Sequence, residues 1–229
     1  MEIIDLQRAL SARGHACGEP DGRYGPRTRS ALLAALTDGP DTPLSDHDIL
    51  EAAHRIGCTA AHIKAVWSVE SAGAGFSGGR PTILFEPHRF SRATEHRFDA
   101  SAPDVSYPKW DKTKYPKSQD ARYAQLIKAV GLDVDAGFAS ASYGAFQILG
   151  ENYEAAGFET PFEFAVAHAT DEASQLAAFV SFVKASGLAD ELMRRDWTGF
   201  ARGYNGTAYK QNKYDERLAA AFLKHGGVA

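Results

Sequence analysis

This sequence has few cysteines, a small net charge and no long apolar runs. The 229 residues include 2 cysteines, Cys17 and Cys58, which are too far apart for a CxxC motif or a paired zinc-ligand spacing. We expect each cysteine to be a buried structural residue, and the spacing leaves a disulfide between them open. The 8 histidines show no HExxH-like spacing, so we expect no metal site and no cofactor.

The small net charge limits the classes of partner. A formal net charge of −4 and a pI near 6.1 argue against a nucleic-acid partner. No stretch approaches the ~18 apolar residues that a membrane-spanning helix needs, so we expect no membrane insertion. The N-terminus, Met1–Asp5, lacks the basic start and apolar core of a signal peptide. We expect synthesis in a reducing cytoplasm, and we expect a monomer.

The composition itself, 44% hydrophobic and 24% charged, predicts a folded chain with one or two domains. Residues 37–43 are rich in turn-forming residues and nearly free of large apolar ones, so we place a boundary there. We predict a small helical unit at 1–38, a linker at 39–44 and a larger, mainly helical domain with a small strand region at 45–229.

The small unit shows two short helices joined by an irregular loop. Ile3, Leu6 and Leu10 predict the first helix, which Gly14 ends, and Pro26 opens the second helix. A unit of this size is marginally stable by itself, so we expect its helices to pack on the larger domain.

The same unit resembles the three-helix type of peptidoglycan-binding module. The resemblance is carried by Leu6-Gln7 and by the run DGxYGxxT that begins at Asp21. This copy begins close to Met1 and lacks the leading helix of longer versions, which implies weaker binding. The alternative is a small helical cap that only shares the loop. The resemblance implies that the module's signature residues contribute to cell-wall binding: Asp21, Gly22, Tyr24 and Thr28.

In the larger domain, several further elements follow from apolar spacing and from capping residues. The predicted elements are a helix from its cap Ser45 to Ile56, a strand over Pro81–Glu86, a long ordered loop from Ser91 to Ser118, a helix around Tyr123–Val130 closed by Gly131, a helix capped by Thr170, and a last helix over 208–224.

Glu70 occupies a position where a helix normally buries an apolar side chain. Thr59 caps a predicted helix that runs to Ser71, and Ile63, Val66 and Trp67 form its apolar stripe. Glu70 is the next position on that stripe, before a glycine-rich run. A carboxylate on an apolar face is poorly solvated, so its pKa should rise toward the range of a general acid. The alternative is a structural glutamate bonded to an arginine or a backbone amide.

Three motifs in order connect Glu70 to a known family. They are Glu70-Ser71, then SASYGAFQI from Ser140, then YNG from Tyr204. This order resembles the lysozyme-superfamily branch of goose-type lysozymes and soluble lytic transglycosylases. The wider runs ILFEPHRF and SYGAFQILGENY resemble the N-acetylmuramidase domain of modular phage endolysins. The resemblance implies an α+β lysozyme-like fold and peptidoglycan as substrate.

Each motif residue has a chemical reason. Glu70 is the expected acid, because glycoside cleavage needs a carboxylic acid at the leaving oxygen. Ser142 and Gln147 suit the N-acetyl and hydroxyl groups of an amino sugar. Tyr204 offers an aromatic face and a hydroxyl that could keep Glu70 protonated, and Asn205 is a further donor and acceptor. The alternatives are a core role for Tyr204 and an ordinary turn at Asn205.

A second carboxylate is expected in the chain between the first two motifs. Glu86 is the best candidate, because it ends the predicted strand and a rigid element positions a group well. Asp99, Asp104 and Asp111 are the others, in the predicted loop. The alternative for Glu86 is a salt bridge to Arg89 or Arg80. Without a second carboxylate, the enzyme would release a 1,6-anhydro product.

The resulting hypothesis is an endolysin that cleaves the β-1,4 bond between N-acetylmuramic acid and N-acetylglucosamine. The resemblance implies a phage protein made in the bacterial cytoplasm, which reaches the wall in the periplasm once the inner membrane is permeabilised. A lytic transglycosylase and a noncatalytic wall-binding protein are the rival hypotheses, and chitin is a weaker alternative substrate.

Overall fold

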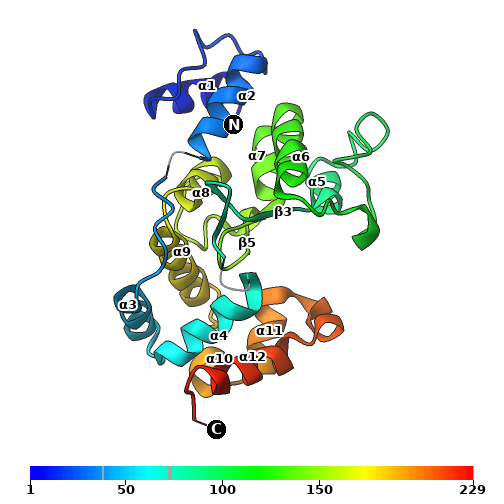
Figure 1. Cartoon of the computed structure of the whole chain (residues 1–229). Helices are drawn as coiled ribbons and strands as arrows, with labels where there is room; N and C mark the ends of the chain where they lie inside the picture. Colours follow the sequence, from blue (N-terminus) through cyan, green and yellow to red (C-terminus); the bar gives the residue numbers. More distant parts are fainter. Residues whose placement is uncertain (38, 72–73, 229) are drawn as a thin grey trace.

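Helices dominate the fold, because apolar residues recur at helical spacing along most of the chain. The computed structural model describes residues 1–37, 39–71 and 74–228 (Figure 1). The helices are α1 Ile3–Ala12, α2 Pro26–Ala35, α3 Asp46–Ile56, α4 Ala60–Ser71, α5 Pro87–Ala93, α6 Gln119–Leu132, α7 Val134–Ala139, α8 Pro161–His168, α9 Glu172–Ala185, α10 Ala189–Arg194, α11 Trp197–Asn205 and α12 Tyr214–Lys224, with 3-10 turns η1 Lys112–Lys114, η2 Gly150–Asn152 and η3 Thr207–Asn212.

The strands are few and short. β1 Phe76–Ser77 and β2 Arg80–Pro81 form a small antiparallel ribbon. β3 Ile83–Phe85, β4 Ala141–Tyr143 and β5 Ile148–Leu149 form an antiparallel sheet with β4 in the middle. The chain is therefore mainly α with a small strand region, which confirms the predicted fold class.

The N-terminal helices pack around one buried glutamine. Gln7 Nε2 donates to Asp21 Oδ1 at 2.9 Å and to Thr28 Oγ1 at 3.1 Å. Gln7 Oε1 accepts from the backbone N–H groups of Asp21 at 3.0 Å and of Gly22 at 2.9 Å. The loop between α1 and α2 is irregular, as predicted. Two of its backbone N–H groups donate to the Gln7 side chain rather than to a neighbouring strand.

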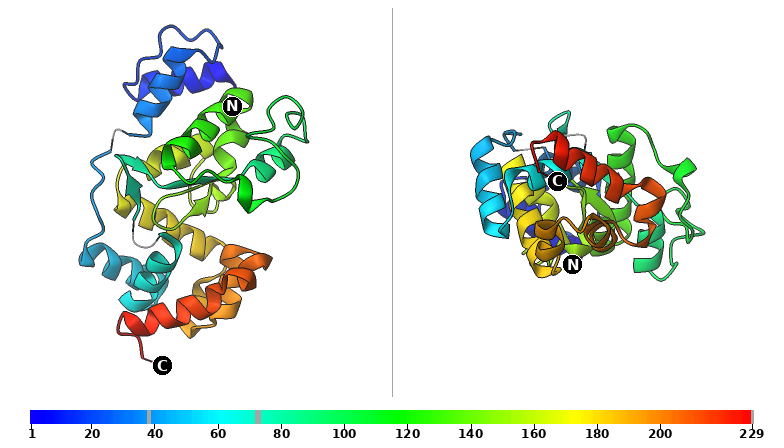
Figure 2. Two further views of the ribbon diagram at one scale, coloured as in Figure 1. Left: turned by 45° about the vertical axis from the view of Figure 1, so that its right-hand side comes forward. Right: turned by 90° about the horizontal axis from the view of Figure 1, so that it is seen from below.

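The N-terminal unit packs on the rest of the molecule, as predicted. The Tyr24 hydroxyl donates to the Ile127 carbonyl at 2.9 Å. The ring of Tyr24 lies so close to α6 that a Cβ added at Gly131 would be 2.4 Å from it. The helices α1 and α2 and the C-terminal helix α12 lie at opposite ends of the molecule (Figures 1 and 2).

The chain after this unit lies along the body. The Glu172 N–H donates to the Thr42 carbonyl at 3.1 Å, and the Leu44 N–H donates to Glu172 Oε2 at 3.0 Å. A Cβ added at Gly39 would meet the Ala169 carbonyl oxygen at 1.9 Å. The described residues 39–44 are therefore held against the start of α9.

An aromatic core holds the sheet between the helices of the body. Phe146 stacks on Phe179 with ring centroids 4.6 Å apart, and Tyr143 meets Phe164 edge-on at 5.6 Å. The largest fully buried side chains include Phe85, Phe90, Phe138, Phe146, Phe162, Phe164, Phe179, Phe200, Tyr123 and Tyr143. In Figure 1, α5 to α8 lie on one side of this core, α3, α4 and α10 to α12 lie on the other, and α9 connects them.

Several predicted elements are confirmed, among them α1, α2 and α4. The helix α3 has Ser45 as its cap, in a capping box with Asp48, and Gly57 in the left-handed region closes it. Ile63 and Val66 of α4 are fully buried. Residues 72–73 of the glycine-rich run 71–75 lie outside the described residues.

Three predicted helix boundaries are wrong. Gly131 lies inside α6, which ends at Leu132 with Asp133 as its C-cap, because Gly131 makes room for Tyr24 rather than closing the helix. The cap of α9 is Asp171, whose side chain accepts from Ser174, and not Thr170. The predicted last helix is divided at Lys213, a left-handed residue between η3 and α12.

The predicted strand and the loop after it also differ. The strand is interrupted at Thr82, whose carbonyl accepts from the Gly144 N–H at 2.8 Å, outside the sheet register. Glu86 lies beyond β3 and is the N-cap of α5. The helix α5 was not predicted, and Pro87 at its first position favours its start. Residues 94–118 form turns and one 3-10 segment, close to the predicted loop.

The two cysteines are free thiols. Cys17 is buried, and its thiol contacts the Gln7 carbonyl at 3.3 Å. Cys58 is half-buried, and burial raises the pKa of its thiol to about 12. No helix within the described residues is long and apolar enough to cross a membrane.

Candidate active site

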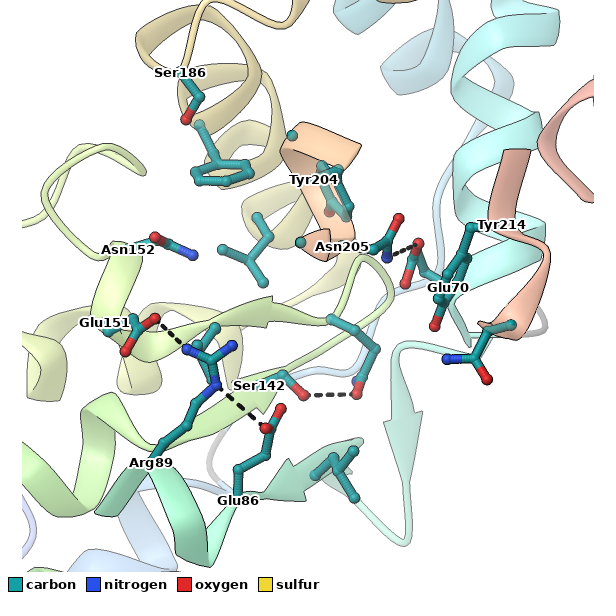
Figure 3. A pocket seen from close by; sticks show the side chains of 18 of the residues that line it. Glu70, Glu86, Arg89, Ser142, Glu151, Asn152, Ser186, Tyr204, Asn205 and Tyr214 are labelled. Atoms are coloured by element: carbon teal, nitrogen blue, oxygen red, sulfur yellow. Dashed lines mark hydrogen bonds and ion pairs between the residues drawn. The ribbon is translucent and has the colours of Figure 1, made fainter. Parts of the chain in front are cut away.

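A cleft of about 820 Å³ runs between the end of α4, the sheet, α5 and the segment from α11 to the start of α12. Figure 3 shows its side chains pointing toward one another from these elements. Its lining includes all six predicted site residues of the larger domain: Glu70, Glu86, Ser142, Gln147, Tyr204 and Asn205. The fold therefore brings together three motifs that are far apart in the sequence.

Glu70 ends α4 with its carboxyl group in the cleft. Burial raises the pKa of this carboxyl to about 7, although a hydrogen bond from Asn205 and the charge of Arg217 both act to lower it. The bond runs from Asn205 Nδ2 to Glu70 Oε1 at 3.0 Å. Tyr214 lies beside the carboxyl (Figure 3). A carboxyl with this pKa is partly protonated near neutral pH, as a general acid requires.

Tyr204 has a different partner from the predicted one. Its hydroxyl donates to the Phe146 carbonyl at 2.7 Å, and its ring stacks on Phe200 at 5.3 Å. The expected role of this hydroxyl in keeping Glu70 protonated is therefore not seen, because the hydroxyl donates to Phe146 instead. Tyr204 lines the cleft and at the same time holds the motif turn that contains Phe146.

Ser142 and Gln147 bond to each other across the turn between β4 and β5. Ser142 Oγ donates to Gln147 Oε1 at 2.9 Å. Gln147 Nε2 donates to the carbonyls of Gly144 at 2.8 Å and of Thr82 at 3.1 Å. Both side chains line the cleft. Their polar groups hold the turn in shape, and direct contact with an amino sugar stays a prediction.

Glu86 lines the cleft and also takes part in an ion-pair network. Arg89 Nε lies 3.2 Å from Glu86 Oε2, and Arg89 also pairs with Glu151. His88 Nε2 lies 3.4 Å from the same Glu86 oxygen. Burial raises the pKa of the Glu86 carboxyl, while Arg89 acts to lower it. Glu86 therefore lines the cleft and also forms the salt bridge to Arg89 that was its predicted alternative role.

The remaining candidate carboxylates lie elsewhere. Asp99 accepts from the Ser106 hydroxyl at 2.6 Å, and Asp104 pairs with Lys128 at 2.6 Å. Asp111 accepts from Thr113. None of the three lines the cleft as the structure describes it.

Sequence reasoning assigned no role in the cleft to several residues that line it. Tyr214 begins α12 and lies next to Glu70, and Trp110 comes from the segment before α6. Arg89 was considered only as a salt-bridge partner. Glu151 and Asn152 directly follow the second motif, and their place in the run SYGAFQILGENY was the only available signal.

Two buried polar side chains of α9 bind the backbone of segments next to the cleft. Glu172 Oε1 accepts from the Gly75 N–H at 2.8 Å, shortly after α4, the helix that carries Glu70. Gln175 Oε1 accepts from the Ala145 N–H at 2.7 Å, in the turn that carries Gln147. Both side chains are buried. The two sides of the cleft are therefore tied to one helix.

The signature residues of the N-terminal unit make bonds within the protein, although Asp21 and Gly22 are exposed and only Thr28 is fully buried. Asp21 and Thr28 bond to Gln7, and Tyr24 bonds to α6. These residues therefore build the loop and the contact with the body, and their role in wall binding stays a prediction.

Across residues 1–37, 39–71 and 74–228, no group of three or more His, Cys, Asp or Glu side chains is placed to hold a metal ion. The polar functional groups of the cleft include carboxyl, amide, hydroxyl, guanidinium and imidazole groups. A buried carboxyl of raised pKa in an open cleft is the arrangement of a glycosidase. The chain belongs to the N-acetylmuramidase family, whose profile matches residues 59–226. The family consists of glycoside hydrolases that act on peptidoglycan.

A solved structure supports this assignment along nearly the whole chain. The chain is similar to the Burkholderia AP3 phage endolysin, with 35% sequence identity and a TM-score of 0.72. The alignment covers 98% of this chain and 94% of that chain. No curated protein matches the chain.

Proposed function

We propose that this protein is a modular endolysin that hydrolyses the β-1,4 bond between N-acetylmuramic acid and N-acetylglucosamine, with Glu70 as general acid. The observation that carries the proposal is the Glu70 carboxyl, whose pKa burial raises to about 7 inside the cleft. Similarity to a phage endolysin supports the lysis role. In that role the protein is made in the host cytoplasm and reaches the wall after the membrane is permeabilised.

The proton donor needs to change charge during the reaction. Glu70 gives its proton to the leaving glycosidic oxygen and becomes a carboxylate. The Asn205 amide already donates to Glu70 Oε1, so it stabilises that carboxylate as it forms. Arg217 favours the same charged form. Burial raises the pKa of Glu70, whereas Asn205 and Arg217 lower it. The resulting pKa keeps the proton available near neutral pH.

Glu86 is proposed to position or activate the water molecule that completes hydrolysis. It lines the same cleft as Glu70, and its pairing with Arg89 fixes its direction. The alternative is a lytic transglycosylase, in which the muramic acid's own hydroxyl attacks and a 1,6-anhydro end forms. The presence of a half-buried carboxyl, Glu86, in the cleft besides Glu70 favours hydrolysis.

The deciding experiment is mass spectrometry of muropeptides released from purified walls. Wild type should release reducing ends, and Glu70→Gln should lower turnover ~10²–10⁴-fold. Glu86→Gln should lower turnover and raise the share of 1,6-anhydro ends. The matched control is Glu151→Gln, which removes the other cleft carboxylate that pairs with Arg89. Wild-type activity in a folded Glu70→Gln variant would contradict the assignment, and exclusively anhydro ends from wild type would favour the transglycosylase.

We further propose that residues 1–38 bind the wall, residues 39–44 link the two parts and residues 45–229 carry out catalysis, in a monomer. The family profile begins at residue 59 and so leaves the N-terminal helices outside it. Sedimentation with insoluble walls should be weaker for a chain that lacks residues 1–36, while cleavage of short glycans persists. If the full chain and the chain that lacks residues 1–36 sediment equally, the N-terminal unit does not bind the wall.

A further inference from the structure

The segment 107–118, which we call the lysine arm, has a composition unlike the rest of the chain. Its sequence, YPKWDKTKYPKS, contains four lysines and one aspartate, a net charge of +3 in a chain of net charge −4. In Figure 1 the chain between α5 and α6 forms the right-hand edge of the molecule. Lys109, Lys114 and Lys117 are exposed. The proposed acid and water-positioning groups make no use of this arm.

Trp110, at the centre of the arm, is an exposed aromatic residue in the cleft wall. It is 56% exposed, and it lines the cleft together with Glu86 and Arg89. Among the large exposed apolar side chains of the described residues, it alone is aromatic and it alone lines the cleft. An exposed tryptophan at a binding cleft marks a surface that a ligand covers.

The arm is held to the body at several points. The Tyr115 hydroxyl lies 3.3 Å from His88 Nδ1, and Arg122 Nε donates to the Pro116 carbonyl at 3.0 Å. Within the arm itself, Lys114 Nζ lies 4.6 Å from the centre of the buried Tyr107 ring. Trp110 therefore projects from an anchored segment, which lowers the ordering cost of binding a ligand there.

We propose that the lysine arm is a subsite for glycan strands that carry peptide stems. Trp110 stacks on a sugar ring on the Glu86 side of the scissile bond, because the apolar face of a sugar matches an aromatic face. Lys109 and Lys117 bind the carboxylates of the acidic stems, which bare glycan lacks. The inference rests on the proposed function and adds a preference for peptide-substituted substrate.

Charge complementarity favours this occupant over an anionic membrane surface. A membrane contact requires Trp110 to project away from the protein, whereas Trp110 lines the same cleft as Glu70. In a chain whose net charge is negative, a local excess of lysine offsets the repulsion between the protein and an acidic polymer. The effect should weaken at high salt.

The test compares two substrates: glycan strands with their peptide stems and the same strands after an amidase has removed the stems. Trp110→Ala should raise KM about tenfold on both substrates, with kcat within about twofold of wild type. Lys109→Gln/Lys117→Gln should raise KM on the stem-bearing strands only, and high salt should remove that difference. The controls are Leu50→Ala, with a side chain 59% exposed away from the cleft, and Arg55→Gln/Lys224→Gln, which removes two exposed charges elsewhere.

Three results would overturn the inference. The first is an unchanged KM for Trp110→Ala, and the second is an equal effect of the lysine substitutions on both substrates. The third is unchanged kinetics together with lost binding to vesicles of anionic phospholipid, which would assign the arm to a membrane. If wild type releases no product, the proposed function fails, and sedimentation of the same variants with walls still tests the arm.

Discussion

At the scale of single residues, the acidity of Glu70 depends on a balance between burial and two polar neighbours. Burial raises the pKa of the carboxyl, whereas the Asn205 amide and the Arg217 charge lower it. The group is active as an acid when protonated, so activity should fall as pH rises through about 7. A substitution of Asn205 or Arg217 should therefore shift the pH at which activity falls, which is the alkaline limb of the pH profile.

Asn205→Leu tests that dependence. The substitution removes the donor that favours the Glu70 carboxylate, so the alkaline limb of kcat against pH should move to higher pH. Tyr204→Phe is the matched control, because its hydroxyl bonds to Phe146 and not to Glu70. Steady-state rates on soluble glycan over pH 5–9 would measure both. An unmoved limb in Asn205→Leu would show that the observed limb belongs to another group.

The raised pKa of Glu70 also predicts a pH-dependent loss of stability. The folded pKa of about 7 lies above the unfolded value of 4.5, so the folded state binds the proton more tightly. The contribution of Glu70 to stability is therefore greatest below pH 4.5, falls as pH rises toward 7 and stays low above it. Glu70→Gln should unfold with a free energy up to about 3 kcal/mol higher than wild type at pH 8.

Urea unfolding at several pH values would measure this difference. The gain in Glu70→Gln should disappear below pH 4.5, where wild-type Glu70 is protonated in both states. A constant difference across the whole pH range would instead indicate a packing effect of the substitution.

At the scale of elements, the turn between β4 and β5 determines how Gln147 lies in the cleft. Gly144 has φ of +70° and Gln147 has φ of +48°, so two residues of this turn lie in the left-handed region. The buried Gln175 lies against the turn, and a Cβ added at Gly144 would meet its amide oxygen at 2.5 Å. Glycine is therefore required here for close approach as well as for backbone conformation.

Gly144→Ala should lower both stability and activity. Gly78→Ala is the control, because Gly78 has φ of +62° but no atom within 4 Å of an added Cβ. Both variants bear the backbone strain of about 1–2 kcal/mol, and overpacking should cost Gly144→Ala about 1–3 kcal/mol more. Thermal unfolding and turnover would test this, and equal losses in the two variants would contradict a role for the Gln175 contact.

At the scale of the whole molecule, Glu172 joins three distant segments. Its carboxylate accepts from Leu44 in the chain after the N-terminal unit and from Gly75 after α4. It lies at the start of α9, the helix that also carries Gln175. The same side chain thus joins the linker that follows the N-terminal unit to the segment after α4.

Glu172→Gln should destabilise the protein by about 1–3 kcal/mol, because one of the two backbone N–H groups loses its acceptor. Glu163→Gln is the control, since Glu163 is 38% exposed and lies 3.9 Å from Arg13; it should cost about 1 kcal/mol or less. Calorimetry would compare the two melting temperatures. Similar values for both variants would show that the buried bonds contribute little.

The amino-acid sequence by itself determined the local features of this protein. Apolar periodicity and capping residues predicted α1, α2, α3 and α4, because these signals act over one or two helical turns. The misplaced carboxylate at Glu70 pointed to an acid, and the three motifs pointed to the family. The boundary at Gly131 failed because glycine has two uses, to end a helix or to admit a neighbouring side chain, and these look alike in a sequence.

Tertiary structure decided which polar groups meet. Only the fold placed Asn205 on Glu70 and directed the Tyr204 hydroxyl to Phe146. Only the fold brought Trp110 to the cleft, since no local pattern marks a residue that acts from a turn. Hydrogen bonds and burial depend on atoms from segments far apart in the chain. A sequence can name a carboxyl that is out of place, but the pKa of that carboxyl depends on what packs around it.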